Sequence, residues 1–187
     1  MSKPDAALLE RLRQSGIRIN AEGHFVHEGD FVLHEGLRQA LFRWLDRLPD
    51  GRTILRLDEN RFVYLDVDDT PLVVRALRFA SREVELGSTE RIAGGKFDGD
   101  ARVLLSLSDG REEPLDPETL TLDGAGVLRC WVRRAGPDAP LDARLEARLA
   151  TSAAAALAER ISQTPAGAVL TLGSRGFPLR PRPGSRP

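Results

Sequence analysis

Apolar residues recur at spacings of three and four in three parts of the chain, which is the period of one face of an α-helix. Residues 4–14 form a short leading segment of this kind, which stops at Gly16. A second segment runs from Leu37 to Leu48 and ends at Pro49-Asp50-Gly51. A third runs from Leu141 to Ile161 and has an alanine-rich centre. The pattern predicts three helices, and the last two are long.

Alternating apolar and polar residues, many of them β-branched or aromatic, predict strands elsewhere. The first half contains a hairpin over Ile17–Glu28, with its turn at Gly23, and then an antiparallel meander of residues 53–58, 61–67 and 72–79. The second half contains strands 101–108, 119–123, 127–133 and 168–172, of which the middle two form a hairpin. We predict one buried face opposite the helix that carries Leu145 and Leu149, made of Val103, Leu105, Leu107, Leu128, Cys130 and Val132.

The segment between the two groups of strands, residues 87–100, is polar and rich in glycine. We take it as a junction between an N-terminal half, residues 1–86, and a C-terminal half, residues 101–179. Residues 180–187 read as a flexible, basic, proline-rich tail. The predicted fold class is α+β, with two small antiparallel β-sheet halves each backed by a long helix.

Charge and composition exclude several classes of function. The 27 lysines and arginines balance 28 aspartates and glutamates, so the chain lacks the basic excess of a dedicated nucleic-acid-binding protein. Cys130 is the only cysteine, which rules out an internal disulfide and a cysteine-only metal site. No apolar leader or stretch of about 20 apolar residues is present. We expect a cytoplasmic protein without a membrane segment, and the pattern leaves its oligomeric state open.

Four short motifs carry a family resemblance: Ile17-Arg-Ile19 with Glu22-Gly-His-Phe-Val-His-Glu-Gly29, then Val67-Asp-Asp-Thr-Pro71, Leu141-Asp-Ala-Arg-Leu145, and Ser174-Arg-Gly-Phe-Pro-Leu179. Together they resemble the bacterial family catalogued as domain of unknown function 1285, over nearly the whole chain. The resemblance implies two similar β-rich halves with a helix each, a cleft between them, and a ligand-sensing or signalling role. It implies no catalytic residue.

The sharpest catalytic motif is Val63-Tyr-Leu-Asp66-Val-Asp68-Asp69-Thr70, which is similar to the nucleophile motif of haloacid-dehalogenase-type phosphatases. Carried over from that family, Asp66 would be the nucleophile and Asp68 the acid/base, and both would help to hold Mg²⁺. A helix should follow the motif, yet Pro71 introduces another strand-like run. We expect an acidic turn between strands, with a Mg²⁺-dependent phosphatase as an alternative.

Three histidines lie close together in sequence beside acidic residues: His24, His27 and His34. Imidazole and carboxylate groups together can hold zinc or iron, so His24 and His27 are weak metal candidates, as are Asp66 and Asp68. On a strand, however, residues three apart point to opposite faces. We therefore expect neither a metal nor a cofactor.

Arginines give the best candidate for a binding site. Arg52 and Arg56 share one face of a predicted strand, and Arg75 lies on an adjacent one. Ser174 and Arg175, in the closing motif, complete the predicted ligand contacts. We expect a non-enzymatic ligand-binding or regulatory module that takes a small anionic ligand in a cleft between its halves. The other alternative is a module for protein partners, which would carry an exposed apolar patch.

Overall fold

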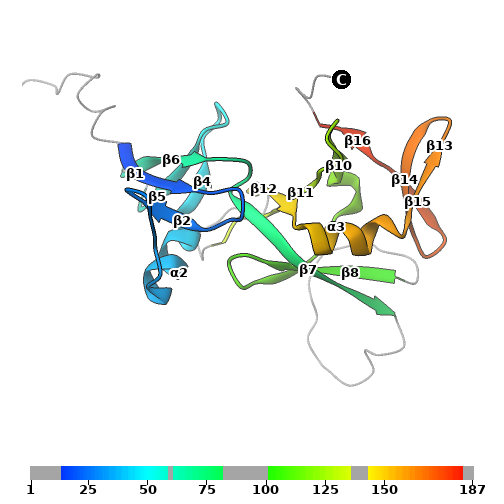
Figure 1. The fold of residues 1–187 in the computed structure, drawn as a ribbon, viewed down its shortest axis with the longest axis horizontal. Coiled ribbons are helices and arrows are strands. Elements are labelled where there is room, and N and C mark those ends of the chain that lie inside the picture. Colours follow the sequence, from blue (N-terminus) through cyan, green and yellow to red (C-terminus); the bar gives the residue numbers. More distant parts are fainter. Residues whose placement is uncertain (1–13, 59–60, 82–100, 136–142, 183–187) are drawn as a thin grey trace, which may run out of the picture. The chain divides into compact units, whose positions relative to one another are not determined.

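The computed structural model describes residues 14–58, 61–81, 101–135 and 143–182, and most of them lie in β-strands (Figure 1). Within these ranges the α-helices are α2 (Glu35–Trp44) and α3 (Thr151–Ala158), and a 3₁₀ turn, η2, spans Pro117–Thr119. None of the helices in the described ranges is long and apolar enough to cross a membrane. The α+β class is compatible with this content, although sheet predominates.

The first sheet has six strands in the order β3-β2-β1-β6-β5-β4. Their bounds are β1 Gln14–Ile19, β2 Phe25–His27, β3 Asp30–Phe31, β4 Leu45–Arg47, β5 Thr53–Arg56 and β6 Phe62–Val67. The predicted hairpin is confirmed, because Ile19 pairs with Phe25 in antiparallel register. The expectation of purely antiparallel sheets is wrong, since β1 and β6 run parallel and pair Arg18 with Asp66.

The second sheet has seven strands in the order β16-β10-β11-β12-β7-β8-β9, and a third small sheet has the order β13-β14-β15. Their bounds are β7 Leu72–Ser81, β8 Ala101–Leu107, β9 Glu112–Pro114, β10 Thr121–Leu122, β11 Leu128–Arg133, β12 Arg144–Leu149, β13 Ile161–Thr164, β14 Gly167–Leu172, β15 Arg175–Pro178 and β16 Arg180–Pro181. The second predicted hairpin is confirmed by the Leu122–Leu128 pair. The predicted meander is wrong beyond β6, because β7 belongs to the second sheet.

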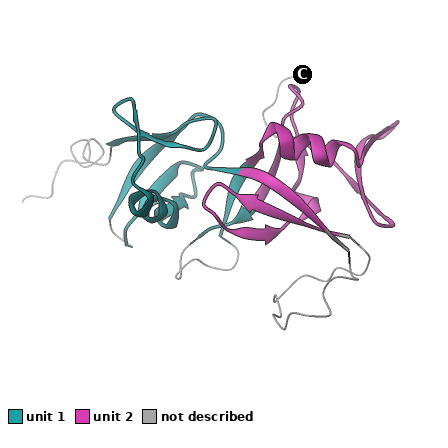
Figure 2. Cartoon of the chain, turned by 60° about the horizontal axis from the view of Figure 1, so that its bottom comes forward, with its two compact units in different colours: residues 1–73, 132–147 teal, residues 74–131, 148–187 magenta. Residues whose placement is uncertain are grey.

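The chain divides into two compact units, each built from two separate stretches of sequence (Figure 2). Unit 1 is Met1–Val73 with Val132–Ala147, and unit 2 is Val74–Trp131 with Arg148–Pro187. The predicted junction at residues 87–100 lies outside the described residues, as does most of the predicted leading helix. Arg180 and Pro181, placed in the tail by the sequence, form β16 beside β10.

The long predicted helix over Leu141–Ile161 is wrong. Strand β12 occupies Arg144–Leu149, α3 begins at Thr151, and β13 begins at Ile161. Burial in β12 alternates residue by residue, with Leu145, Ala147 and Leu149 buried. The other predicted long helix is also shortened, because the chain leaves α2 at Trp44 and enters β4. Within the described residues, none of the three sheets is therefore backed by a long helix.

Alternation along the strands supplies the buried cores. All six side chains of the predicted face are buried, together with Leu145 and Leu149, although these last two lie on a strand. In unit 1, the ring of Phe25 from β2 packs edge-on against Phe42 of α2, with 4.8 Å between the ring centroids. Leu41 is buried on the same helix, and Ile54 and Leu55 are buried on β5. The strand phases predicted for β8 and β11 are thus confirmed.

Candidate functional site

A pocket of about 270 Å³ opens on unit 2 where η2, β15 and β16 meet. Its lining consists of Glu118, Arg175, Gly176, Phe177, Pro178 and Arg180. Three of these six side chains carry a formal charge. The pocket therefore combines a small volume with several charged groups and an aromatic ring.

The hairpin of β14 and β15 places the arginine and the aromatic ring. The turn passes through Gly173, whose φ of 58° suits glycine, and the strands then pair Leu172 with Arg175 and Leu170 with Phe177. Residues two apart on a strand share a face, so Arg175 and Phe177 lie on the same side. The Arg175 guanidinium carbon lies 5.1 Å from the centroid of the Phe177 ring, which is itself buried. Arg175 and Phe177 thus form a cation–π contact at the pocket.

The remaining two charged residues come from η2 and β16. The side chain of Asp116 caps η2 by accepting from the Glu118 backbone N–H at 3.3 Å, and Pro117 anchors the turn by its burial. Arg180 belongs to β16, which pairs in parallel with β10 and sets Arg180 opposite Thr121. Strands distant in sequence thus bring Arg180 to the same pocket as Glu118.

Among the residues that the structure describes, no ion pair neutralises the charges in the pocket. Arg175, Arg180 and Glu118 form no ion pair with any residue that the structure describes. Two guanidinium groups against one carboxylate give the lining a formal excess of one positive charge. Arginine donors without a protein partner favour an acidic group, because guanidinium and carboxylate or phosphate groups form bidentate, charge-assisted hydrogen bonds.

The arginines predicted on the first-half strands are engaged with other side chains. Arg56 donates from Nε to Asp46 at 2.6 Å. Arg52 pairs with Asp50 at 2.8 Å and lies 4.2 Å over the ring of Tyr64. Both belong to unit 1, whereas Arg75 is exposed on the part of β7 that belongs to unit 2.

Of the two predicted residues in the closing motif, Arg175 lines the pocket and Ser174 lies exposed in the turn before it. Sequence reasoning missed Glu118, Phe177 and Arg180. The alternation along β15 could have placed Phe177 beside Arg175. No local signal marks Glu118 or Arg180, because the parallel pairing of β10 with β16 brings them to the pocket.

The acidic motif has a different setting from that of the phosphatases. Asp66 is exposed on β6, and Asp68 forms an ion pair with Arg18 at 3.4 Å while its backbone N–H donates to the Ile19 carbonyl. Thr70 is buried, and its hydroxyl donates to the Leu72 carbonyl at 2.7 Å. Strand β7 follows where that family has a helix. The carboxylates thus stand at a turn that enters a strand.

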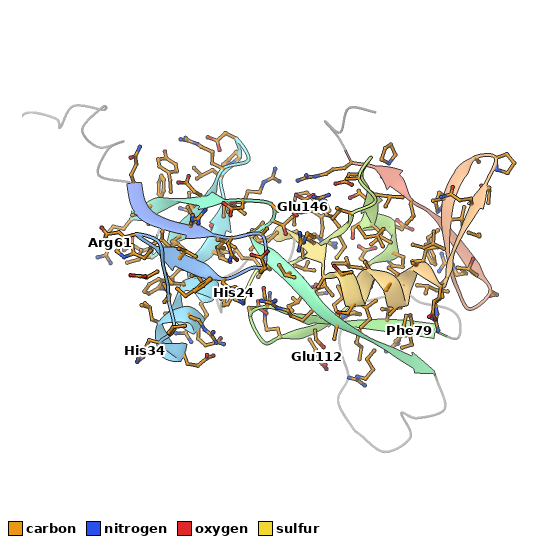
Figure 3. All side chains as sticks on the ribbon, viewed as in Figure 1. His24, His34, Arg61, Phe79, Glu112 and Glu146 are labelled. Carbon is orange, nitrogen blue, oxygen red and sulfur yellow. The ribbon has the colours of Figure 1, made fainter. Side chains whose placement is uncertain are left out.

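The three histidines do not form a metal cluster. His24 packs edge-on against Phe31, with 5.7 Å between the ring centroids, and His27 lies beside Gly16. His34 caps α2, where its Nδ1 accepts from the Leu37 backbone N–H at 3.2 Å. His24 and His34 are well separated in Figure 3. Over the part of the chain that the structure describes, no three histidine, cysteine or acidic side chains come together as metal ligands.

Comparison with known proteins finds similarity at the level of structure. No family model and no curated protein matches the sequence. The crystal structure of a DUF1285 family protein from Silicibacter pomeroyi DSS-3 is similar over 89% of this chain and 80% of its own, with a TM-score of 0.61 and 17% identity. A DUF1285 family protein from Shewanella baltica OS155 covers 73% of this chain and 84% of its own, with a TM-score of 0.47 and 18% identity. The chain therefore resembles the DUF1285 family in its fold, as its short motifs predicted.

Proposed function

We propose that this protein is a non-enzymatic ligand-binding or regulatory module that holds a small anionic molecule in the pocket of unit 2. The observation that carries the proposal is the presence of two arginines, Arg175 and Arg180, in one pocket without an ion-pair partner among the described residues. An anion that enters would replace water around both guanidinium groups with charge-assisted hydrogen bonds. The pocket lies within unit 2, whereas the sequence suggested a cleft between halves.

The pocket also offers an apolar surface beside the charges. Phe177 lines the pocket beside Arg175, whose guanidinium carbon lies 5.1 Å from the centroid of its ring. The ring fixes the guanidinium in place and reduces the side-chain entropy that binding would otherwise remove. A short carbon chain with an acidic end suits this combination, and succinate is a practical first probe.

The test is a calorimetric titration with succinate and with inorganic phosphate. For Arg175→Ala and for Arg180→Ala we expect binding to weaken by about 1.5–3 kcal/mol, the range for hydrogen bonds to charged groups. The control is Arg61→Ala, because Arg61 is exposed in unit 1 and pairs with Asp58 (Figure 3). The proposal is wrong if neither anion binds saturably, or if the two pocket variants bind as the control does.

A second function is favoured by three exposed apolar side chains that lie close together in the sequence of unit 1, termed the patch below: Phe31, Leu33 and Leu37. Their exposed fractions are 57%, 80% and 45%. The patch follows the turn that carries Glu28 and Asp30, two exposed carboxylates that pair with no cation in the described ranges. A second copy of the same surface would bring like charges together, so we propose a partner protein with a basic, apolar surface.

This second proposal is tested with a synthetic helical peptide of leucine and arginine, against a matched peptide of leucine and glutamate. We expect the basic peptide to bind at low ionic strength and the acidic one not to bind. The double change Phe31→Ser with Leu33→Ser should abolish binding, whereas Leu57→Ser, at another exposed leucine, should not. Equal binding by both variants would contradict the proposal.

A further inference from the structure

Glu118 is the feature of the pocket that an anion alone does not explain. Its carboxylate lines the same pocket as Arg175 and Arg180, yet it pairs with neither arginine nor with another cation of the described chain. A ligand with acidic groups only would meet repulsion from this carboxylate. The lining thus presents donors for an acid and an acceptor for a cation around one small space.

The local structure keeps these opposite charges apart. Glu118 is fixed by η2, where the Asp116 cap holds the backbone N–H of Glu118 and the Thr119 hydroxyl donates to the Asp116 carbonyl at 2.8 Å. Arg175 is fixed by the β14–β15 pairing and by its position over Phe177. Because each charged group belongs to a separately anchored element, the space between them is available to a bridging molecule.

We infer that the ligand is a small zwitterion, whose acidic group contacts Arg175 and Arg180 and whose ammonium group contacts Glu118. This inference rests on the proposed function and adds the class of ligand. An ammonium group is a compact cation with three donors and no acceptor, which matches a carboxylate. Glu118 is then the residue that selects amino acids over diacids.

The size of the pocket agrees with a ligand of this kind. Its volume of about 270 Å³ lies just below the range of about 300–1,000 Å³ that is usual for drug-sized ligands. A single amino acid or a molecule of similar length therefore fits a pocket of this volume. Short chains with charges at both ends are the simplest members of the class.

The experiment compares three four-carbon molecules that differ only in their end groups: γ-aminobutyrate, succinate and putrescine. Calorimetry on the whole chain should show γ-aminobutyrate binding at least tenfold more tightly than succinate, and putrescine not binding. A longer set, ε-aminocaproate, adipate and hexamethylenediamine, covers a wider separation of charges. The preference for the amino acid should appear in at least one set.

Glu118→Gln is the decisive variant. Only the backbone N–H of Glu118 takes part in the η2 cap, so the change should leave the turn intact. We expect this change to weaken the binding of the amino acid at least tenfold and to leave the binding of succinate unchanged or tighter. The control is Glu112→Gln, because Glu112 is exposed on β9 and pairs with Arg78 (Figure 3).

The outcomes separate this inference from the proposal beneath it. One outcome is that the diacid binds as tightly as the amino acid in both sets, with neither affinity changed by Glu118→Gln. In that case the inference of a zwitterionic ligand is wrong, but the proposal of an anion site stands. If Arg175→Ala and Arg180→Ala leave every affinity unchanged, both ideas fail. A preference for the amino acid that Glu118→Gln removes, and that either arginine variant abolishes, supports both.

Discussion

At the scale of single residues, Asp46 stands out because its one carboxylate forms ion pairs with two arginines. Arg56 donates to it at 2.6 Å, and Arg134 forms an ion pair with it at 2.8 Å. All three side chains are largely shielded from water, with exposed fractions of 17% for Asp46, 27% for Arg56 and 13% for Arg134. Removing this carboxylate would leave two partly buried cations facing each other without an anion.

We therefore predict that Asp46→Ala lowers the free energy of unfolding by about 2–4 kcal/mol, near the range for breaking a buried ion pair from one side. Urea denaturation followed by circular dichroism measures the change. The matched control is Asp50→Ala, since Asp50 pairs with Arg52 at the surface and should contribute far less. Similar losses for the two variants would show that Asp46 has no special role.

A second residue-scale prediction concerns acid. The pKa of Asp123 lies below its ordinary value, first because Arg129 donates to its carboxylate, and also because the Val127 and Ala125 backbone N–H groups do so. A depressed pKa in the folded state stabilises the fold above the unfolded-state pKa of about 3.9 and ceases to do so as the pH falls through the lower folded value.

Urea titrations of the wild type and Asp123→Asn should thus differ in unfolding free energy at neutral pH and converge as the pH falls below about 4. The variant removes the titrating group and changes the side-chain volume little. A difference that stays constant from neutral to acidic pH would contradict the assignment.

Residue-level prediction from the sequence succeeded for the apolar positions of β11, although Arg129 between two of them is buried as well. Leu128, Cys130 and Val132 lie on the buried face that their spacing indicated. Arg175, which the sequence predicts as a ligand contact, lines the pocket of unit 2. Arg56 is also a predicted ligand contact, and its guanidinium pairs with Asp46, a residue that the sequence placed on a helix.

At the scale of elements, the main error of the prediction came from a residue spacing that fits both a helix and a strand. Leu141, Leu145 and Leu149 are four residues apart, which suits one face of a helix but is also a multiple of the strand period of two. The buried Ala147 between two of these leucines distinguishes the strand, yet alanine is also the best helix former. The residue period alone could not distinguish a helix from a strand here. The pairing of the segment within the surrounding sheet makes it a strand.

The hairpin of β10 and β11 gives an element-scale prediction with a built-in control. Gly126 has a φ of 80°, a left-handed conformation that penalises other residues, whereas Gly124 in the same turn does not have a positive φ. Open space surrounds a methyl group added at Gly126, so only the backbone opposes the change. We predict that Gly126→Ala destabilises the protein by about 1 kcal/mol and that Gly124→Ala has little effect.

Thermal or urea unfolding of both variants checks this prediction. If the two substitutions have equal effects, the hairpin has a turn of another type. The position of the control within the same turn removes differences in solvent exposure and in neighbouring residues as explanations.

At the scale of the whole molecule, the order of the chain differs from the order of its compact units. Residues 132–147 return to unit 1 after the chain has formed much of unit 2. They supply the buried side chains of Leu145 and Ala147 and the arginine, Arg134, that pairs with Asp46. No local sequence pattern predicts that residues 132–147 belong to unit 1, because the contacts join segments that are far apart in sequence.

We predict that a fragment of residues 1–86 does not fold alone, since it lacks these groups. Its NMR spectrum should show little chemical-shift dispersion. The intact chain with a protease site inserted in residues 87–100 is the control, and after cleavage its two pieces should still elute together from a sizing column. A well-dispersed spectrum for the fragment would mean that residues 132–147 are dispensable for unit 1.

The return of residues 132–147 to unit 1 also means that unit 1 is completed late during synthesis. The first stretch of unit 1 leaves the ribosome before unit 2, whereas its second stretch, residues 132–147, emerges only after all of Val74–Trp131 has been translated. At about 5–20 residues per second, that delay is roughly 3–12 seconds. During this interval Asp46 lacks Arg134, and the nascent strands of unit 1 lack their last segment. The exposed species during synthesis is therefore a chain whose first sheet, β1 to β6, has been translated while Asp46 still lacks Arg134. This is the state that a chaperone at the ribosome exit would protect.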